Sequence, residues 1–334
     1  ASLSPEAVRP HCDILIRGEI EDIAPAIFAD LASGKYKDEY VGGRPDTIDG
    51  LLPNWRLYPN DRAMLATLQT SRGCPFECEF CDVIQYLGRK QRFKSISSVL
   101  AELDLLYALG YRSVFLADDN FTVYRSRCKE LLDALKFWND KRAEKVHFVT
   151  QVSIDAAKDE ELLRMCADAG LTGVFIGIET PNEESLRASK KRQNLRVNLV
   201  DQIGQFLEHG IVVTGGMIVG FDNDTPDIFQ RQFDFAEAAN VPIFSVGALV
   251  APAATPLYER IGREGRLSQD GEEVAALPWN TNINPLRMTR EDLLHGLKWL
   301  CNRLYNPEIF ADRVVRFVEE LKARPVSVGV SARR

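Results

Sequence analysis

The 334-residue sequence predicts an α/β fold, specifically a partial (βα)6 TIM-like barrel with parallel strands. Short β-rich runs alternate with amphipathic helical runs six times, and such alternation is typical of a parallel sheet with crossover helices. The strand-like runs are continuously apolar, as expected of parallel strands that are covered on both faces. Six units are too few for a complete eight-fold barrel. A doubly wound sheet is the alternative that periodicity alone leaves open.

Each strand of the predicted barrel is followed by its helix. The six strands are expected at residues 65–70, 113–117, 147–152, 173–178, 211–220 and 244–250. Their helices are expected at residues 95–109, 125–141, 159–169, 195–208, 227–239 and 257–261. Ser95 is the expected N-cap of the first helix, and Gly110 and Gly170 follow helix ends, where a left-handed residue often ends a helix.

The flanks of the barrel predict three segments: an N-terminal α/β remnant with a linker (1–62), the core (63–264) and a C-terminal helical extension (265–334). The first segment offers one strand (13–19) and one helix (20–31), and a single βα unit cannot bury its own core. Because the chain begins at Ala1 without an initiator Met, we expect it to be part of a longer protein. Two helices, 291–304 and 307–322, are expected to form a packed helical cap.

Composition narrows the possible partners. The net charge of −7 and the pI near 5.4 argue against a nucleic-acid binder, which usually carries a basic surplus. No apolar run approaches the roughly 18 residues that a membrane span needs. The seven cysteines are an odd number, and three of them crowd into eight residues, so a disulfide framework is not expected. A reducing cytoplasm is therefore the predicted location.

Cys74, Cys78 and Cys81 form a C-x3-C-x2-C motif directly after the first predicted strand. Sites in α/β folds lie at the carboxyl ends of strands, so the motif is well placed. Three thiolates can ligate three irons of a 4Fe–4S cluster and leave the fourth iron open to a substrate. The alternative is structural zinc, which normally takes four protein ligands. No second cysteine pair follows, and the four histidines lie far away in the sequence.

Residues 70–81, with the aromatic Phe80 before the last cysteine, resemble the cluster loop of the radical S-adenosylmethionine (SAM) superfamily. The resemblance implies that Cys74, Cys78 and Cys81 hold a 4Fe–4S cluster whose open iron is chelated by the methionine part of SAM. One electron then breaks a carbon–sulfur bond of SAM. An electron donor such as a flavodoxin or ferredoxin is implied as a partner.

The same resemblance implies that SAM is contacted by residues at the ends of the other strands. Each position also has an ordinary structural explanation, as a helix cap, a loop entry, a charged strand end or a glycine bulge. The implied contacts are Asp118 or Asp119 for the amine of SAM, Gln151 and Ser153 for its carboxylate or ribose, Glu179 for the ribose, Gly216 and Ile218 for adenine, and Phe80 in the cluster loop.

Four further segments, residues 12–19, 156–163, 220–225 and 281–285, are similar to the cobalamin-dependent class that includes hopanoid methylases. That class passes a methyl group from SAM through cobalamin to an unactivated carbon of a small molecule or lipid. The D-x-H-x-x-G cobalamin signature is absent here, so use of cobalamin stays open. Two alternatives follow: a cobalamin-free radical SAM enzyme that transfers a 3-amino-3-carboxypropyl group, and a non-enzymatic metal-binding module.

Overall fold

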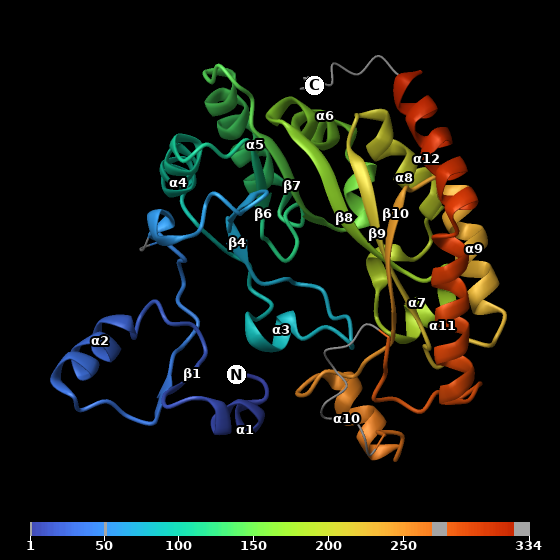
Figure 1. The fold of residues 1–334 in the computed structure, drawn as a ribbon, viewed down its shortest axis with the longest axis horizontal. Coiled ribbons are helices and arrows are strands. Elements are labelled where there is room, and N and C mark those ends of the chain that lie inside the picture. Colours follow the sequence, from blue (N-terminus) through green and yellow to red (C-terminus); the bar gives the residue numbers. More distant parts are fainter. Residues whose placement is uncertain (1, 50–51, 269–278, 324–334) are drawn as a thin grey trace.

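A single six-stranded parallel sheet organises the computed structural model, which describes residues 2–49, 52–268 and 279–323. Neighbouring strands in this sheet follow one another along the chain, and every pair is parallel. Right-handed crossovers that all advance in one direction place every helix on the same face, as in a barrel. The predicted partial barrel is confirmed (Figure 1). Its strands are β3 (Ala66–Leu68), β6 (Ser113–Leu116), β7 (His147–Val152), β8 (Leu171–Glu179), β9 (Val212–Val219) and β10 (Ile243–Ala248).

The crossover helices lie where the sequence places them, with one difference. The predicted helix 195–208 begins at Leu199 because the Asn198 side chain accepts from the amides of Val200 and Asp201 and caps it there. A short helix that was not predicted, α7 (Glu183–Ala188), precedes it. The helices are α4 (Ile96–Ala108), α5 (Arg125–Asp140), α6 (Glu160–Ala169), α8 (Leu199–Glu208), α9 (Ile228–Ala239) and α10 (Pro256–Arg263).

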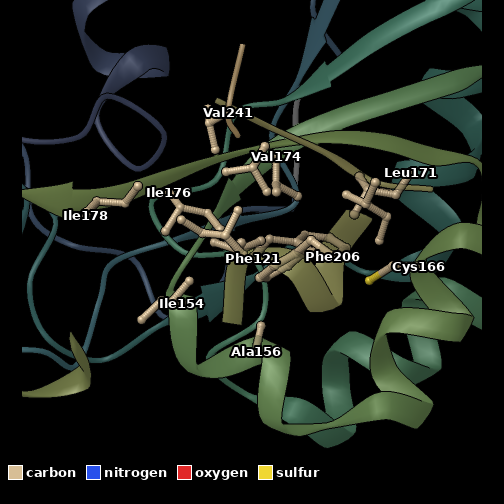
Figure 2. Packing of buried hydrophobic residues seen from close by; sticks show 14 of the residues in the cluster. Phe121, Ile154, Ala156, Cys166, Leu171, Val174, Ile176, Ile178, Phe206 and Val241 are labelled. Atoms are coloured by element: carbon tan, nitrogen blue, oxygen red, sulfur yellow. The ribbon is translucent and has the colours of Figure 1, made fainter. Parts of the chain in front are cut away.

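The main hydrophobic core lies between the sheet and these helices. In β8, Val174, Ile176 and Ile178 are at most 3 % exposed and belong to one buried cluster with Phe206 of α8. Figure 2 shows these side chains packed together. The residues between them, Phe175 and Gly177, are less buried and face the opposite side of the sheet, which is the barrel interior. The sheet therefore has an outer face that packs in the hydrophobic core and an inner, less buried face that can hold a ligand.

The N-terminal segment holds more structure than the single βα unit that the sequence predicts. After α1 (Pro5–Val8), β1 (Leu15–Arg17) and α2 (Ala24–Ser33), a second strand, β2 (Glu39–Val41), pairs in parallel with β1. Three residues of mixed polarity give too weak a pattern for prediction. The segment boundaries at residues 62 and 264 stay predictions.

Two long helices follow the barrel, α11 (Arg290–Leu304) and α12 (Pro307–Lys322), close to the predicted bounds. Four leucines of α11 at helical spacing, Leu293, Leu297, Leu300 and Leu304, are at most 1 % exposed and join the main core. Residues 269–278 and 324–334 of the predicted C-terminal extension lie outside the described residues. Among the helices that the structure describes, none has the length and apolar character to span a membrane.

Candidate cluster and cofactor site

The three clustered cysteines lie on a loop that is closed at its base by two very short strands. β4 (Ser71–Arg72) pairs antiparallel with β5 (Arg92–Phe93), and the loop between them contains the one-turn helix α3 (Val83–Tyr86). Gly73 has φ +94°, and a Cβ there would lie 2.8 Å from the Lys90 carbonyl oxygen. Only glycine fits this turn, which directs Cys74 into the loop. The amide of Cys74 then donates to the Gly88 carbonyl at 3.2 Å.

All seven cysteines of the chain are free thiols. Burial and, to a lesser extent, the charges of Cys78, Asp82 and Cys74 raise the pKa of Cys81 to about 11, although a hydrogen bond from the Val83 amide opposes the shift. Burial also raises the pKa of Cys74, while hydrogen bonds from the Phe76 amide and the Asn120 side chain oppose this effect. The thiols of Cys74, Cys78 and Cys81 therefore lie close enough to influence one another electrostatically. Iron cations would turn this mutual repulsion into attraction.

In residues 2–49, 52–268 and 279–323, no group of three or more His, Cys, Asp or Glu side chains converges closely enough to hold one metal ion. A mononuclear zinc site needs each thiolate sulfur about 2.3 Å from the same ion. A cubane cluster instead presents a separate iron to each cysteine. The three thiols can therefore each meet their own iron without converging on one point.

Asp118, a candidate for the amine of SAM, already has four hydrogen-bond donors within the protein. Its carboxylate accepts from the amide of Thr70 at 2.7 Å and the amide of Ser71 at 3.0 Å, and also from both hydroxyls. These donors occupy the roughly four lone-pair sites of a carboxylate. Asp118 is 1 % exposed, and burial raises its pKa although the hydrogen bonds oppose this shift. Its observed task is to fasten β4 to the end of β6.

The neighbouring residues have unused acceptor capacity. Asp119 accepts from the amide of Gly73 at 2.7 Å. Asn120, which the sequence analysis did not select, is 5 % exposed and hydrogen bonds through its side chain to Cys74 and to Ser153. Its Oδ1, like the Oε1 of Gln91 beside it, is buried and has no hydrogen-bond partner among the described residues. A buried unsatisfied acceptor costs about 1–3 kcal/mol, so a ligand that carries N–H donors fits here.

The predicted third-strand residues differ in position. Ser153 lies beside Asn120 and therefore near Cys74. Gln151 accepts the Phe121 amide through its backbone carbonyl at 2.9 Å and so shapes the chain after Asp119 and Asn120. A direct contact of either residue with SAM stays a prediction.

Glu179 ends β8 in a conformation that is unusual for a residue with a side chain. Its φ is +65°, and the register between β8 and β9 shifts between Gly177 and Glu179. Such backbone strain costs about 1–3 kcal/mol and concentrates at functional sites. The Glu179 carboxylate is nearly buried and accepts from Lys191 Nζ at 2.6 Å. The strain is consistent with a bulge that turns this carboxylate toward the barrel mouth.

Lys191 and Gln193, which were not predicted as site residues, lie between this carboxylate and the thiols. Burial lowers the pKa of Lys191, but the charges of Glu179, Cys78 and Cys81 outweigh burial and raise it overall. Gln193 Nε2 lies 3.6 Å from Cys78 Sγ and donates a hydrogen bond to it, although 115 residues separate the two in sequence. The Gln193 Oε1 is buried without a partner among the described residues. The cation and the amide both face sulfurs that would carry negative charge.

Phe80 and Ile218 lie in one apolar cluster, although they come from the cluster loop and from β9. This apolar cluster includes Phe221, whose ring meets the Phe80 ring edge-on with centroids 6.0 Å apart. Gly216 lies two residues before Ile218 on the same strand, and a Cβ there would approach the Phe175 ring to 2.8 Å. The glycine thus lets the Phe175 ring lie directly against this strand, and a contact of Gly216 with adenine stays a prediction.

Replacing Gly216 by valine should lower the melting temperature, because the new side chain overlaps the Phe175 ring. Overpacking of this kind typically costs about 1–3 kcal/mol. Thermal unfolding followed by circular dichroism measures the change. Gly204 is the control, since a Cβ there meets nothing within 4 Å, and Gly204→Ala should not lower the melting temperature. An unchanged melting temperature for Gly216→Val would show that Phe175 can move aside.

The family model for the radical SAM superfamily matches residues 68–236, which is half of the chain. The chain belongs to the radical SAM superfamily. The matched range begins in β3 and covers the cluster loop together with Asp118, Asp119, Glu179 and Gly216. A second model, a domain of unknown function (DUF4070), matches residues 255–332.

Two curated relatives cover nearly all of this radical SAM protein. An uncharacterised methyltransferase of Synechocystis sp. is 35% identical over 96% of this chain and 60% of its own length. The hopanoid C-2 methylase of Rhodopseudomonas palustris is 31% identical over 91% of this chain and 58% of its own length. The radical SAM chain described here therefore spans about 60% of the length of these relatives.

Solved structures share the fold at low sequence identity. The radical SAM methyltransferase TsrM of Kitasatospora setae, with cobalamin and a [4Fe-4S] cluster bound, matches with a TM-score of 0.58 and 17% identity. The match covers 78% of this chain and 61% of TsrM. The cobalamin-dependent SAM radical enzyme OxsB matches with a TM-score of 0.51 and 16% identity, over 93% of this chain and 42% of OxsB. At this identity the likeness concerns the fold.

Proposed function

We propose that this protein is a radical SAM methyltransferase that modifies a small molecule or lipid in the reducing cytoplasm. Cys74, Cys78 and Cys81 would hold the 4Fe–4S cluster, and a flavodoxin or ferredoxin would reduce it. The observation that carries the proposal is the gathering of three free thiols on the loop after β3. Methyl transfer is supported by the methyltransferase names of the two relatives that cover over nine-tenths of the chain.

The residues around the thiols suit SAM as a ligand. When bound, the cluster supplies the single electron that breaks a carbon–sulfur bond of SAM. The unsatisfied Asn120 oxygen and the Asp119 carboxylate are acceptors for the ammonium group of SAM. Glu179 would accept from the ribose hydroxyls. Gly216 and the apolar side chains of Phe80 and Ile218 would contact adenine and exclude water.

Cobalamin is a further cofactor of the class that the chain resembles. The reaction is therefore tested both with and without added cobalamin.

Anaerobic reconstitution followed by incubation with SAM and a reductant tests the proposal. We expect about four irons and four sulfides per chain, and cleavage of SAM that depends on the reductant. Methylation that requires added cobalamin supports the methyltransferase. Methylthioadenosine formed without cobalamin indicates aminocarboxypropyl transfer instead. A colourless protein that binds zinc and no sulfide contradicts the proposal.

Replacing Glu179 by glutamine should weaken SAM binding about 10- to 100-fold. Hydrogen bonds to a charged group are worth about 1.5–3 kcal/mol, and each 1.4 kcal/mol is a factor of ten in the dissociation constant. Calorimetric titration of the reconstituted protein with SAM measures the change. Glu184→Gln is the matched control, because Glu184 is exposed on α7 and should leave the affinity unchanged. Equal affinities for all three proteins would exclude Glu179 as a SAM contact.

A further inference from the structure

A cationic stretch of chain lies against the cluster loop. Residues 187–196 contain five Lys or Arg residues and no Asp or Glu, in a chain with a net charge of −7. Lys191 turns inward to Glu179, whereas Lys190 and Arg192 on either side of it are exposed. In the part of the chain that the structure describes, the side chains of Lys190 and Arg192 form no ion pair or hydrogen bond. Their charges are therefore presented to solvent rather than neutralised.

Two contacts attach this stretch to the cysteine loop. The carbonyl of Ser189 accepts the amide of Glu79 at 3.0 Å, and the Gln193 side chain donates to Cys78 Sγ at 3.6 Å. Lys190 follows the first contact directly, and Arg192 directly precedes the second. Each exposed cation is thus one residue away from a group that touches the loop. An electron carrier docked on Lys190 and Arg192 would lie close to the Cys78 sulfur, to which it would be linked through the chain at Gln193 and the hydrogen bond from Gln193.

The backbone that carries these cations forms a defined turn. Lys190 has φ +60°, a left-handed conformation that is strained for a residue with a side chain. The amide of Lys191 donates to the Leu186 carbonyl at 2.9 Å and holds the turn. On another part of the loop, by contrast, Arg89 is paired with Glu77 at 2.6 Å and offers less free charge.

We propose that Lys190 and Arg192 form a docking surface for an acidic one-electron carrier protein that reduces the cluster. The inference rests on the proposed function, because it needs a cluster at Cys78. The carrier is oxidised by one electron and the cluster is reduced by the same electron, with no bond formed or broken. Complementary charge raises the encounter rate of two proteins about 10- to 1,000-fold, and salt screens this gain.

The test is a charge reversal, Lys190→Glu/Arg192→Glu, with a reduced [2Fe–2S] ferredoxin as the probe. Stopped-flow absorbance measures the rate at which the reconstituted cluster is reduced. At low ionic strength we expect at least a tenfold fall in this rate, and the steep salt dependence of the natural protein should be lost. Photoreduced deazaflavin, which needs no docking surface, should reduce both proteins equally fast. The milder Lys190→Gln/Arg192→Gln pair should show a smaller fall in the same direction.

The matched control is Arg164→Glu/Lys298→Glu, which makes the same charge change at exposed positions of α6 and α11. It should be reduced by ferredoxin nearly as fast as the natural protein. An unchanged ferredoxin rate in the first variant, or an equal loss with deazaflavin, overturns the docking surface. Absence of iron and sulfide from the natural protein instead contradicts the proposed function. In that case, binding of oxidised ferredoxin to the apoprotein and to the charge-reversed variant still decides whether the surface docks the carrier.

Discussion

Cys78→Ala is expected to abolish cluster assembly and, with it, all reductive cleavage of SAM. Cys78 is the most buried of the three cysteines at 7 % exposure, and its sulfur receives the Gln193 hydrogen bond. A cubane that loses one of three protein ligands has a second open iron, which exposes it to solvent and to dissociation. Iron and sulfide analysis after anaerobic reconstitution should give values near zero. The absorbance of the cluster should be missing as well.

The control for this prediction is Cys301→Ala on α11. Cys301 is half-buried beside the core cluster and lies on a helix that carries none of the three cysteines. This variant should assemble the cluster to the level of the natural protein. Full iron and sulfide in Cys78→Ala would show that the cluster ligands have been assigned wrongly. A loss in both variants would point to misfolding, which a melting curve detects.

The barrel could be predicted from the sequence because its information is local. Each strand and helix has its own apolar pattern, and the predicted cap Ser95 lies only three residues before the Ser98 amide that donates to it. The cysteine motif is equally local, since its three members lie within eight residues. Patterns that span only a few residues can be recognised in the sequence without knowledge of the fold.

The site could be predicted only by residue type, because its contacts join distant parts of the chain. Asp118 was selected as a carboxylate at a strand end, but its four donors come from residues 47 and 48 positions earlier. Those donors give it a role in holding β4, which no local pattern shows. Gln193 meets Cys78 across 115 residues. The left-handed turn at Glu179 accompanies a register shift between β8 and β9, and such a shift cannot be predicted from the sequence.

The N-terminal segment is joined to the cluster loop by a buried ion cluster around Glu19. The Glu19 carboxylate accepts from Arg92 Nη1 at 2.9 Å and from Arg72 Nη1 at 2.7 Å. The side chains of Glu19 and Arg92 are 2 % and 3 % exposed. Arg72 and Arg92 are paired residues of β4 and β5, the two strands that close the base of the cysteine loop. The geometry of the cluster loop thus depends on a residue from outside the barrel.

Glu19→Ala should therefore destabilise the protein by about 3–5 kcal/mol, because it leaves the Arg92 charge buried without its partner. Chemical denaturation at neutral pH measures this loss. Glu39→Ala is the control, since its pairs with Arg9 and Arg17 are part-exposed and such pairs contribute little to stability. A similar small loss for both variants would mean that Arg92 finds another acceptor.

The pH dependence provides a separate test of the same ion cluster. Burial alone would raise the pKa of Glu19, but hydrogen bonds and charge from Arg92 and Arg72 outweigh it and lower the pKa. A lowered pKa in the folded state stabilises the protein fully above the ordinary glutamate pKa of about 4.3. This stabilisation is lost as the pH falls through the folded value. The difference in unfolding free energy between the natural protein and Glu19→Ala should therefore be constant near neutral pH and shrink in acid. A difference that instead grows as the pH falls would mean that the Glu19 carboxylate is protonated in the folded protein, and that the two arginines are held by other groups.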